Sequence, residues 1–264
     1  MMFDTRGSIF PVLRHDFARD KPITVDTWRD GEYLGTGFFV DTSSPTVAFV
    51  TAKHVVDVSL GPHQRIGIGS VETNGIYWWD YFEHHKTADI AVAYIERQSL
   101  PEWIKPLKLI PPDQTPPLGT EVVAFGFPLS EKRQTVDGKK VFRIVETCFR
   151  GYIAAIYDKD SLDGMDGAFS VNYALSFESP NGLNGAPLLL LRGDKVLVGG
   201  LIYKNKSTYF LIDQETTTDK EGRIEKEISY RDGYGTLLTS WTKSNMGSPT
   251  ESETVGDATA SKAR

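Results

Sequence analysis

The stretch Glu-Ser-Pro-Asn-Gly-Leu-Asn-Gly-Ala-Pro-Leu-Leu-Leu-Leu, residues 178–191, joins a turn to a buried strand. Its first part holds two Asn-Gly pairs, which favour tight turns because glycine accepts positive φ angles. Its last part is a continuous apolar run, typical of a strand buried in a β-protein. Small residues within 182–187 surround one larger polar side chain, Asn184. The loop has the form of one that presents a nucleophile, yet a carboxamide cannot act as a nucleophile at neutral pH.

The bulk composition limits the possible partners. The 264 residues suffice for one large all-β domain or for two halves that share a site. The net charge is −6 and the basic residues are scattered, so we expect neither nucleic acid nor an anionic membrane surface as a partner. No apolar run reaches the ~18 residues of a membrane span, so no membrane insertion is expected. The oligomeric state does not follow from composition.

Cysteine usage bears on compartment and cofactors. Cys148 is the single cysteine, so no disulfide can form within the chain. No spacing of cysteine and histidine indicates zinc, and we expect neither a metal nor another cofactor. The N-terminus lacks a basic start followed by an apolar run, so no signal peptide is expected. These features together predict a reducing, cytoplasmic compartment.

Short runs rich in valine, isoleucine and aromatic residues recur along the chain and are separated by turn-forming residues. A proline-rich stretch at 97–120 divides them into two series, which favours a barrel or a sandwich over alternating strands and helices. We expect a short C-terminal helix near 234–243. Residues 244–264 contain no aromatic residue and no leucine or isoleucine, so we expect a disordered tail.

Two further stretches bear on the function. The strand "TVAFVTA" at 46–52 leads to His54, and the apolar strand "IAVAYIE" at 90–96 follows directly on Asp89. Each residue alone is more often structural, because a histidine at a strand end or an aspartate before a strand usually serves as a cap or turn residue. Their order along the chain, followed by Asn184, makes a joint role more plausible.

This order and its motifs resemble the trypsin/chymotrypsin-like serine peptidases, in the branch without disulfides. "TAKHVV" resembles the histidine motif, "DIAV" the aspartate motif, and "GLNGAP" the G-x-S-G-G/A-P loop, while "GTEVVAFGFP" and "GYIAAI" match accessory stretches. The resemblance implies an all-β fold of two packed antiparallel six-stranded barrels. The peptidase domain would then cover 1–243, with the first barrel at about 20–110 and the second at about 118–210.

The resemblance also implies roles for the site residues. His54 matches the general base and Asp89 the carboxylate that orients it. Asn184 takes the position of the nucleophilic serine, and the backbone N–H groups of Gly182 and Asn184 match the oxyanion hole. A polypeptide is the implied substrate or ligand. Glu178 matches the base of the specificity pocket, and the stretch Tyr203, Lys204 and Asn205 matches the strand edge on which an extended peptide lies.

Asn184 departs from the family pattern, and the sequence leaves three explanations open. The asparagine is natural and the chain is a pseudo-protease that binds peptides or serves as a scaffold. Alternatively it was introduced into an otherwise active endopeptidase, or the alignment is shifted and 179–187 is only a connecting loop. In the first two cases the chain as written is expected to be inactive, because no acyl-enzyme can form without a hydroxyl.

Overall fold

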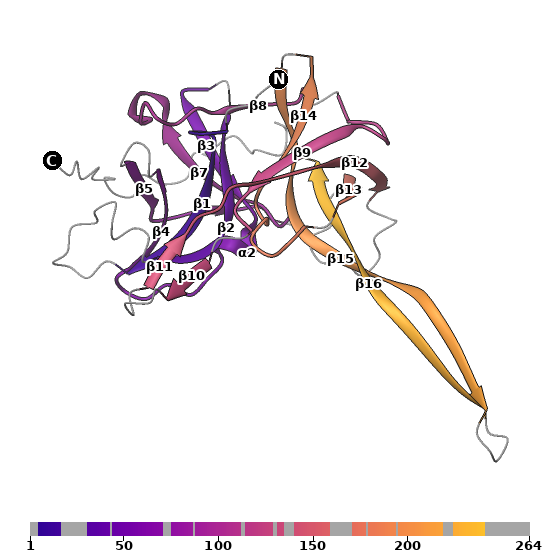
Figure 1. Ribbon diagram of the computed structural model, residues 1–264. Coiled ribbons are helices and arrows are strands. Elements are labelled where there is room, and N and C mark those ends of the chain that lie inside the picture. Colours follow the sequence, from indigo (N-terminus) through magenta and orange to yellow (C-terminus); the bar gives the residue numbers. More distant parts are fainter. Residues whose placement is uncertain are drawn as a thin grey trace.

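The computed structural model describes residues 5–16, 31–42, 44–70, 75–86, 88–111, 114–128, 131–134, 140–158, 171–177, 179–193, 195–218 and 224–240. The predicted tail, 244–264, and residues 241–243 of the predicted helix lie outside these ranges. Nearly all of the described secondary structure is strand, arranged mainly in one fourteen-stranded sheet (Figure 1). The all-β class predicted from the sequence is confirmed.

The first half of the chain contributes an open series of antiparallel strands. β1 lies between β2 and β4, β2 continues through β3 to β7 and then β6, and β4 pairs with β5. A four-residue helix, α2, follows β3, and a 3₁₀ turn, η1, follows β7. The elements are β1 (Ile9–Asp16), β2 (Glu32–Asp41), β3 (Thr46–Thr51), α2 (Lys53–Val56), β4 (Gln64–Ser70), β5 (Gly75–Trp79), β6 (Glu83–His84), β7 (Ala91–Glu96) and η1 (Arg97–Ser99).

The second half contributes a closed ring of pairings, which runs β14, β9, β12, β13, β16, β15 and back to β14. These strands are β9 (Glu121–Gly126), β12 (Thr147–Asp158), β13 (Val171–Leu175), β14 (Pro187–Arg192), β15 (Lys195–Thr218) and β16 (Ile224–Ser240). A separate hairpin is formed by β10 (Glu131–Gln134) and β11 (Lys140–Arg143). The sequence predicted two six-stranded barrels; the pairings close into a ring only in this half of the described chain.

A short strand within the proline-rich stretch connects the two halves. β8 (Leu107–Leu109) pairs in parallel with β2 on one side and with β15 on the other. The halves are therefore parts of one continuous sheet, and their buried side chains form two clusters. Phe49 and Trp79 stack with ring centroids 4.4 Å apart in the larger cluster, a geometry that adds to the free energy gained by burying them.

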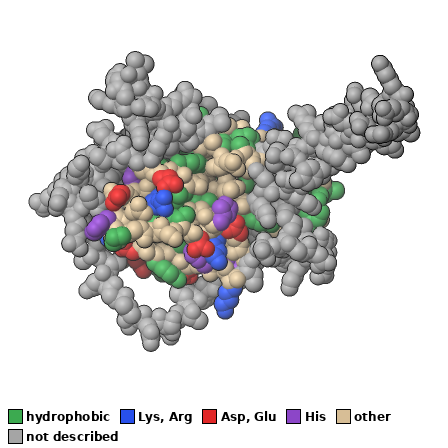
Figure 2. Space-filling view, turned by 90° about the horizontal axis from the view of Figure 1, so that it is seen from below, with side chains coloured by type: hydrophobic (Ala, Val, Ile, Leu, Met, Phe, Trp, Pro, Cys, Tyr) green, Lys and Arg blue, Asp and Glu red, His purple; other side chains and the backbone are tan. Residues whose placement is uncertain are grey.

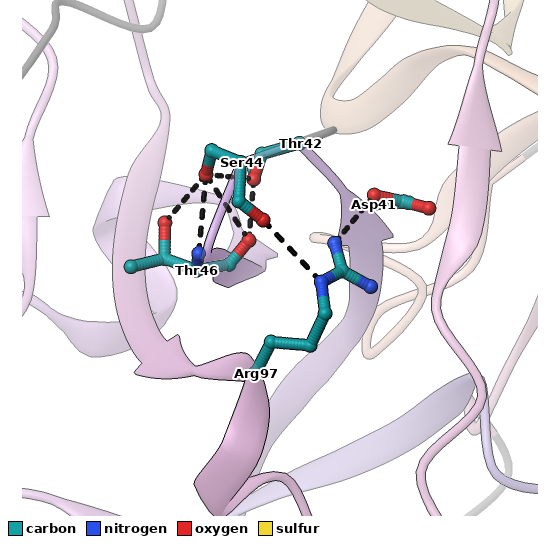
Figure 3. A network of polar contacts seen from close by, with 5 residues as sticks. All are labelled: Asp41, Thr42, Ser44, Thr46 and Arg97. Carbon is teal, nitrogen blue, oxygen red and sulfur yellow. Dashed lines mark hydrogen bonds and ion pairs between the residues drawn. The ribbon is translucent and has the colours of Figure 1, made fainter.

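The turn between β2 and β3 is tied to the end of β7 by a polar network (Figure 3). Arg97 donates to the Asp41 carboxylate at 2.7 Å and to the carbonyl of Ser44 at 3.3 Å. The hydroxyls of Thr42 and Ser44 both reach the carbonyl of Thr46. These contacts fix the end of the hairpin whose other end leads to His54.

The predicted C-terminal helix is wrong for the residues that the structure describes. Residues 234–240 belong to β16, which pairs with β15 along one edge and with β13 along the other. Leu238, for example, lies opposite both Ile202 and Tyr173. A short segment has little intrinsic helix stability, so pairing on both sides decides its conformation.

β15 and β16 continue beyond the ring as a long hairpin. Their register extends from Gly200 opposite Ser240 to Thr218 opposite Ile224. In Figure 1 the distal part of the hairpin projects away from the rest of the sheet. This distal part contains the described residues of the strongly charged stretch 212–233.

Candidate functional site

His54 is carried by α2, directly after β3. The valines that follow it, Val55 and Val56, are buried and anchor the helix on the core, whereas the His54 side chain remains 46% exposed. Thr51, the last residue of β3, is buried and its hydroxyl donates to the carbonyl of Thr36 at 2.7 Å. The imidazole therefore projects from a firmly held strand end.

Asp89 precedes β7 and faces His54. Its neighbours Ala88 and Ile90 are buried, which holds the backbone in place. One carboxylate oxygen, Oδ1, accepts the backbone N–H of His54 at 2.9 Å, and Oδ2 lies 2.6 Å from the imidazole Nδ1. Because a carboxylate can only accept, Nδ1 carries a proton, and in the neutral imidazole Nε2 keeps a lone pair that points to the opposite side.

The environment of Asp89 favours its charged form. Burial raises the pKa of the Asp89 carboxyl, but the hydrogen bond and the charge of His54, together with the backbone N–H groups of His54 and Lys53, lower it. The pKa of Asp89 is lowered overall, so the carboxylate stays ionised and keeps accepting from the imidazole.

Asn184 completes a line of three side chains. Its carboxamide Nδ2 lies 3.0 Å from Nε2 of His54, on the side of the ring opposite Asp89. With Nε2 as the acceptor, the amide N–H is the donor. The structure thus brings together His54, Asp89 and Asn184, which lie far apart in the sequence. The face viewed in Figure 2 shows histidine side chains next to acidic ones, among apolar and uncharged surface.

The loop around Asn184 is held on both sides. The Asn184 carbonyl accepts the backbone N–H of Thr36 at 2.9 Å, and the N–H of Gly185 donates to the carbonyl of Ile202 at 2.6 Å. The side chain of Leu183 is fully buried in the smaller core cluster, and this packing holds the loop against the core. Gly185 has a φ of 86°, which a residue with a side chain rarely adopts.

Gly182 is held through its carbonyl. This oxygen accepts from the Tyr33 hydroxyl at 2.5 Å and from the Thr36 hydroxyl at 2.9 Å. Burial raises the pKa of Tyr33 far above its ordinary value, although the hydrogen bond to Thr36 opposes this, so the phenol stays protonated and donates. Within the described ranges, the N–H groups of Gly182 and Asn184 donate to no protein acceptor. They are available to a ligand oxygen.

Tyr33 and Thr36 were not among the residues predicted from the sequence. Both belong to β2, and their hydroxyls donate to the carbonyl of Gly182 in the loop of residues 182–185. Neither residue type indicates such a role, and only the packing of β2 against the loop reveals it. No sequence signal could have found them.

The structure describes the backbone of three of the four predicted substrate-binding residues. Glu178 lies outside the described residues. The side chain of Tyr203 is buried, and its hydroxyl donates to Oδ1 of the buried Asn172 at 3.1 Å. The backbone positions of Lys204 and Asn205 pair with β16 along one edge, opposite Leu237 and Thr236.

No group of three or more histidine, cysteine, aspartate or glutamate side chains among the described residues is placed to hold a metal ion. In the same part of the chain, no helix has the length and apolar character needed to cross a membrane.

The model of the trypsin-like peptidase domain matches residues 35–199, more than half of the chain. The chain belongs to this family. The family resemblance predicted from the sequence is thereby confirmed, and the match includes His54, Asp89 and the loop around Asn184.

Solved structures also resemble the trypsin-like chain. One is Rv3671c from M. tuberculosis H37Rv, crystallised as a serine-to-alanine mutant in an inactive form. It aligns with a TM-score of 0.46 and 17% sequence identity, over 89% of this chain and 82% of that chain. No curated protein matches the sequence.

The lowered pKa of Asp89 predicts how stability depends on pH. Between the folded pKa and the unfolded value of about 3.9, the unfolded chain binds more protons than the folded one. The contribution of Asp89 to stability is therefore present above about pH 4 and is lost as the pH falls through the folded pKa.

Urea unfolding at several acidic pH values should show a smaller loss of unfolding free energy for Asp89→Asn than for the parent. Asp57→Asn, at an exposed position nearby, makes the same substitution outside this pair and is the control variant. Identical pH profiles for Asp89→Asn and the parent would contradict this.

Proposed function

We propose that this trypsin-like serine protease family member does not hydrolyse peptide bonds, because position 184 carries no nucleophile. The observation that supports the proposal is the 3.0 Å contact between the Asn184 amide and Nε2 of His54. An active site of this kind needs a hydroxyl at that point, whose proton the imidazole removes during attack. Here an amide N–H donates to Nε2 instead, and the nitrogen's lone pair is delocalised into the adjacent carbonyl.

The remaining parts of the site cannot replace the missing hydroxyl. In proteases of this type, binding and the oxyanion hole alone leave only about 10³–10⁴-fold acceleration over water. The nearby Ser179 is buried, at 1% exposure. Cys148 lies on β12, and both burial and the charge of Glu146 raise the pKa of its thiol, which disfavours the reactive thiolate.

We further propose that the site formed by His54, Asp89 and the loop around Asn184 binds an extended polypeptide without cutting it. The N–H groups of Gly182 and Asn184 supply two backbone donors for a peptide carbonyl, and neither donor depends on the side chain at 184. The strand Lys204–Asn205 would add main-chain hydrogen bonds by β-augmentation.

A cytoplasmic location is also part of the proposal, because a single cysteine fits a reducing compartment. Finding the chain secreted would contradict this part.

A single experiment tests both parts of the proposal. The purified chain is titrated calorimetrically with a library of extended peptides, and the peptides are recovered for mass spectrometry. We expect binding at micromolar to millimolar affinity and full recovery of intact peptide. Cleaved peptides would refute the loss of hydrolysis, whereas the absence of any binding would refute the peptide-binding role.

A further inference from the structure

The loop beside His54 contains two Asn-Gly pairs that the fold treats differently. In an Asn-Gly pair the backbone nitrogen of glycine can attack the asparagine side chain, because glycine has no Cβ to obstruct the approach. Asn181 and Asn184 share this local sequence and lie three residues apart. Any difference between them in the folded protein must come from their surroundings.

The pair Asn184–Gly185 is protected. The Gly185 nitrogen donates to the carbonyl of Ile202 at 2.6 Å, and Gly185 is buried. The nitrogen that would leave as ammonia, Nδ2 of Asn184, is itself hydrogen-bonded to His54. Attack would require the loop to break these bonds and to rotate a peptide plane inside a packed site.

The pair Asn181–Gly182 has none of these restraints. Asn181 is exposed and occupies a turn closed by the Leu183 N–H, which donates to the carbonyl of Pro180 at 3.1 Å. In the described part of the chain, the Gly182 N–H donates to no protein acceptor. Rotation of this peptide plane therefore breaks no hydrogen bond of its N–H group. The carbonyl of Gly182 is held by Tyr33 and Thr36, but it belongs to the next peptide unit.

We propose that Asn181 is a site of spontaneous deamidation and that the fold directs the reaction to it and away from Asn184. The Gly182 nitrogen loses its proton to solvent base and forms a bond to Cγ of Asn181. The Cγ–Nδ2 bond breaks and ammonia leaves, giving a cyclic imide. Water then opens the ring at either carbonyl, which yields aspartate or isoaspartate at 181.

The modification changes the groups beside Asn184. In the imide the Gly182 nitrogen carries no hydrogen, so one of the two free donors is lost. After hydrolysis the N–H returns next to a new carboxylate, which would repel a carbonyl or anionic oxygen bound there. Isoaspartate also lengthens the main chain before Gly182 by one carbon. This consequence for binding rests on the proposed function, whereas the choice of Asn181 over Asn184 does not.

Peptide mapping of the aged protein tests the proposal. The folded chain and the urea-unfolded chain are incubated in the same mildly alkaline buffer, and deamidation at 181 and 184 is followed over time. In the folded chain, Asn181 should react about tenfold faster than Asn184, since a tenfold factor corresponds to the loss of one hydrogen bond of about 1.4 kcal/mol. In the unfolded chain the two rates should approach each other, because both asparagines precede glycine.

Two results would overturn the proposal: equal or faster reaction at Asn184 in the folded chain, or the same preference for Asn181 in urea as in the fold. Asn181→Gln is the control variant at this exposed position and should remove the signal at 181 alone. The third Asn-Gly pair, at 74–75, yields a separate peptide and does not confuse the assignment. Peptide titration of the aged chain then tests the effect on binding separately, so its failure leaves the choice of site intact.

Discussion

Asn184→Ser is expected to make the chain react with a serine-directed fluorophosphonate. The new hydroxyl oxygen would be attached to Cβ, one bond nearer the backbone than the amide nitrogen that now lies 3.0 Å from Nε2 of His54. The lone pair of Nε2 already points towards residue 184, because Nδ1 is hydrogen-bonded to Asp89 at 2.6 Å. The base, its orienting carboxylate and the backbone donors thus need no further change.

The expected size of the gain is large. Loss of the serine or the histidine in a well-studied serine protease lowers kcat by roughly 10⁶-fold, so restoration of a usable geometry should raise the labelling rate at least about 10³-fold. Intact-protein mass spectrometry of the labelled chain measures this directly. Peptide cleavage by the variant would follow the same increase.

Two matched variants identify the cause of such a gain. Asn184→Ala removes the amide without adding a hydroxyl and should stay unlabelled. His54→Ala added to Asn184→Ser should abolish the labelling, because the hydroxyl then has no base. A folded Asn184→Ser chain that remains unlabelled would show that the loop no longer presents position 184 for attack. Labelling of the parent chain would place the nucleophile at another residue and refute the proposed inactivity.

The sequence singled out three residues that the structure brings together, whereas its predicted C-terminal helix is a strand in the described residues. His54, Asp89 and Asn184 follow short motifs at strand ends, and strand ends are specified by local patterns of apolar and turn residues. The contacts of Tyr33 and Thr36 with Gly182 depend on how β2 packs against a loop about 150 positions away, which no local pattern encodes. The C-terminal helix was predicted wrongly for a related reason, since the pairing partners of residues 234–240 lie on β13 and β15.

The loss of one side chain need not alter the shape of this loop. Its conformation depends on the carbonyls of Gly182 and Asn184, the N–H of Gly185 and the buried side chain of Leu183. None of these contacts involves the side chain at 184. A serine-to-asparagine change would therefore remove the nucleophile and leave the conformation of the loop unchanged, as the proposed binding of peptides requires.

Gly185→Ala is expected to destabilise the protein severely, whereas Gly193→Ala should have only a mild effect. Both glycines have positive φ angles, 86° and 63°, so each alanine carries the strain of the left-handed conformation, about 1–2 kcal/mol. A Cβ at Gly193 would meet nothing within 4 Å. A Cβ at Gly185 would lie 2.0 Å from the carbonyl oxygen of Thr36 and 2.3 Å from the hydroxyl of Thr51.

The clash at Gly185 cannot be relieved by rotating a side chain, because the nearest atom belongs to the backbone of β2. The loop would have to move, which breaks the bond from Gly185 to Ile202 and the bond from Thr36 to Asn184. Two such bonds at about 1 kcal/mol each, added to the backbone strain, give a loss of at least about 3–4 kcal/mol. That is a large part of the 5–15 kcal/mol that typically stabilises a domain.

Urea unfolding of the two alanine variants measures the difference. If Gly185→Ala does not fold, the comparison is made on soluble yield and on Gly185→Ser, which meets the same backbone oxygen. Equal unfolding free energies for the variants at 185 and 193 would show that the loop can move away from β2 at little cost. In that case the fold would not fix the positions of the Gly182 and Asn184 N–H donors. A bound peptide would then be needed to bring the two donors together.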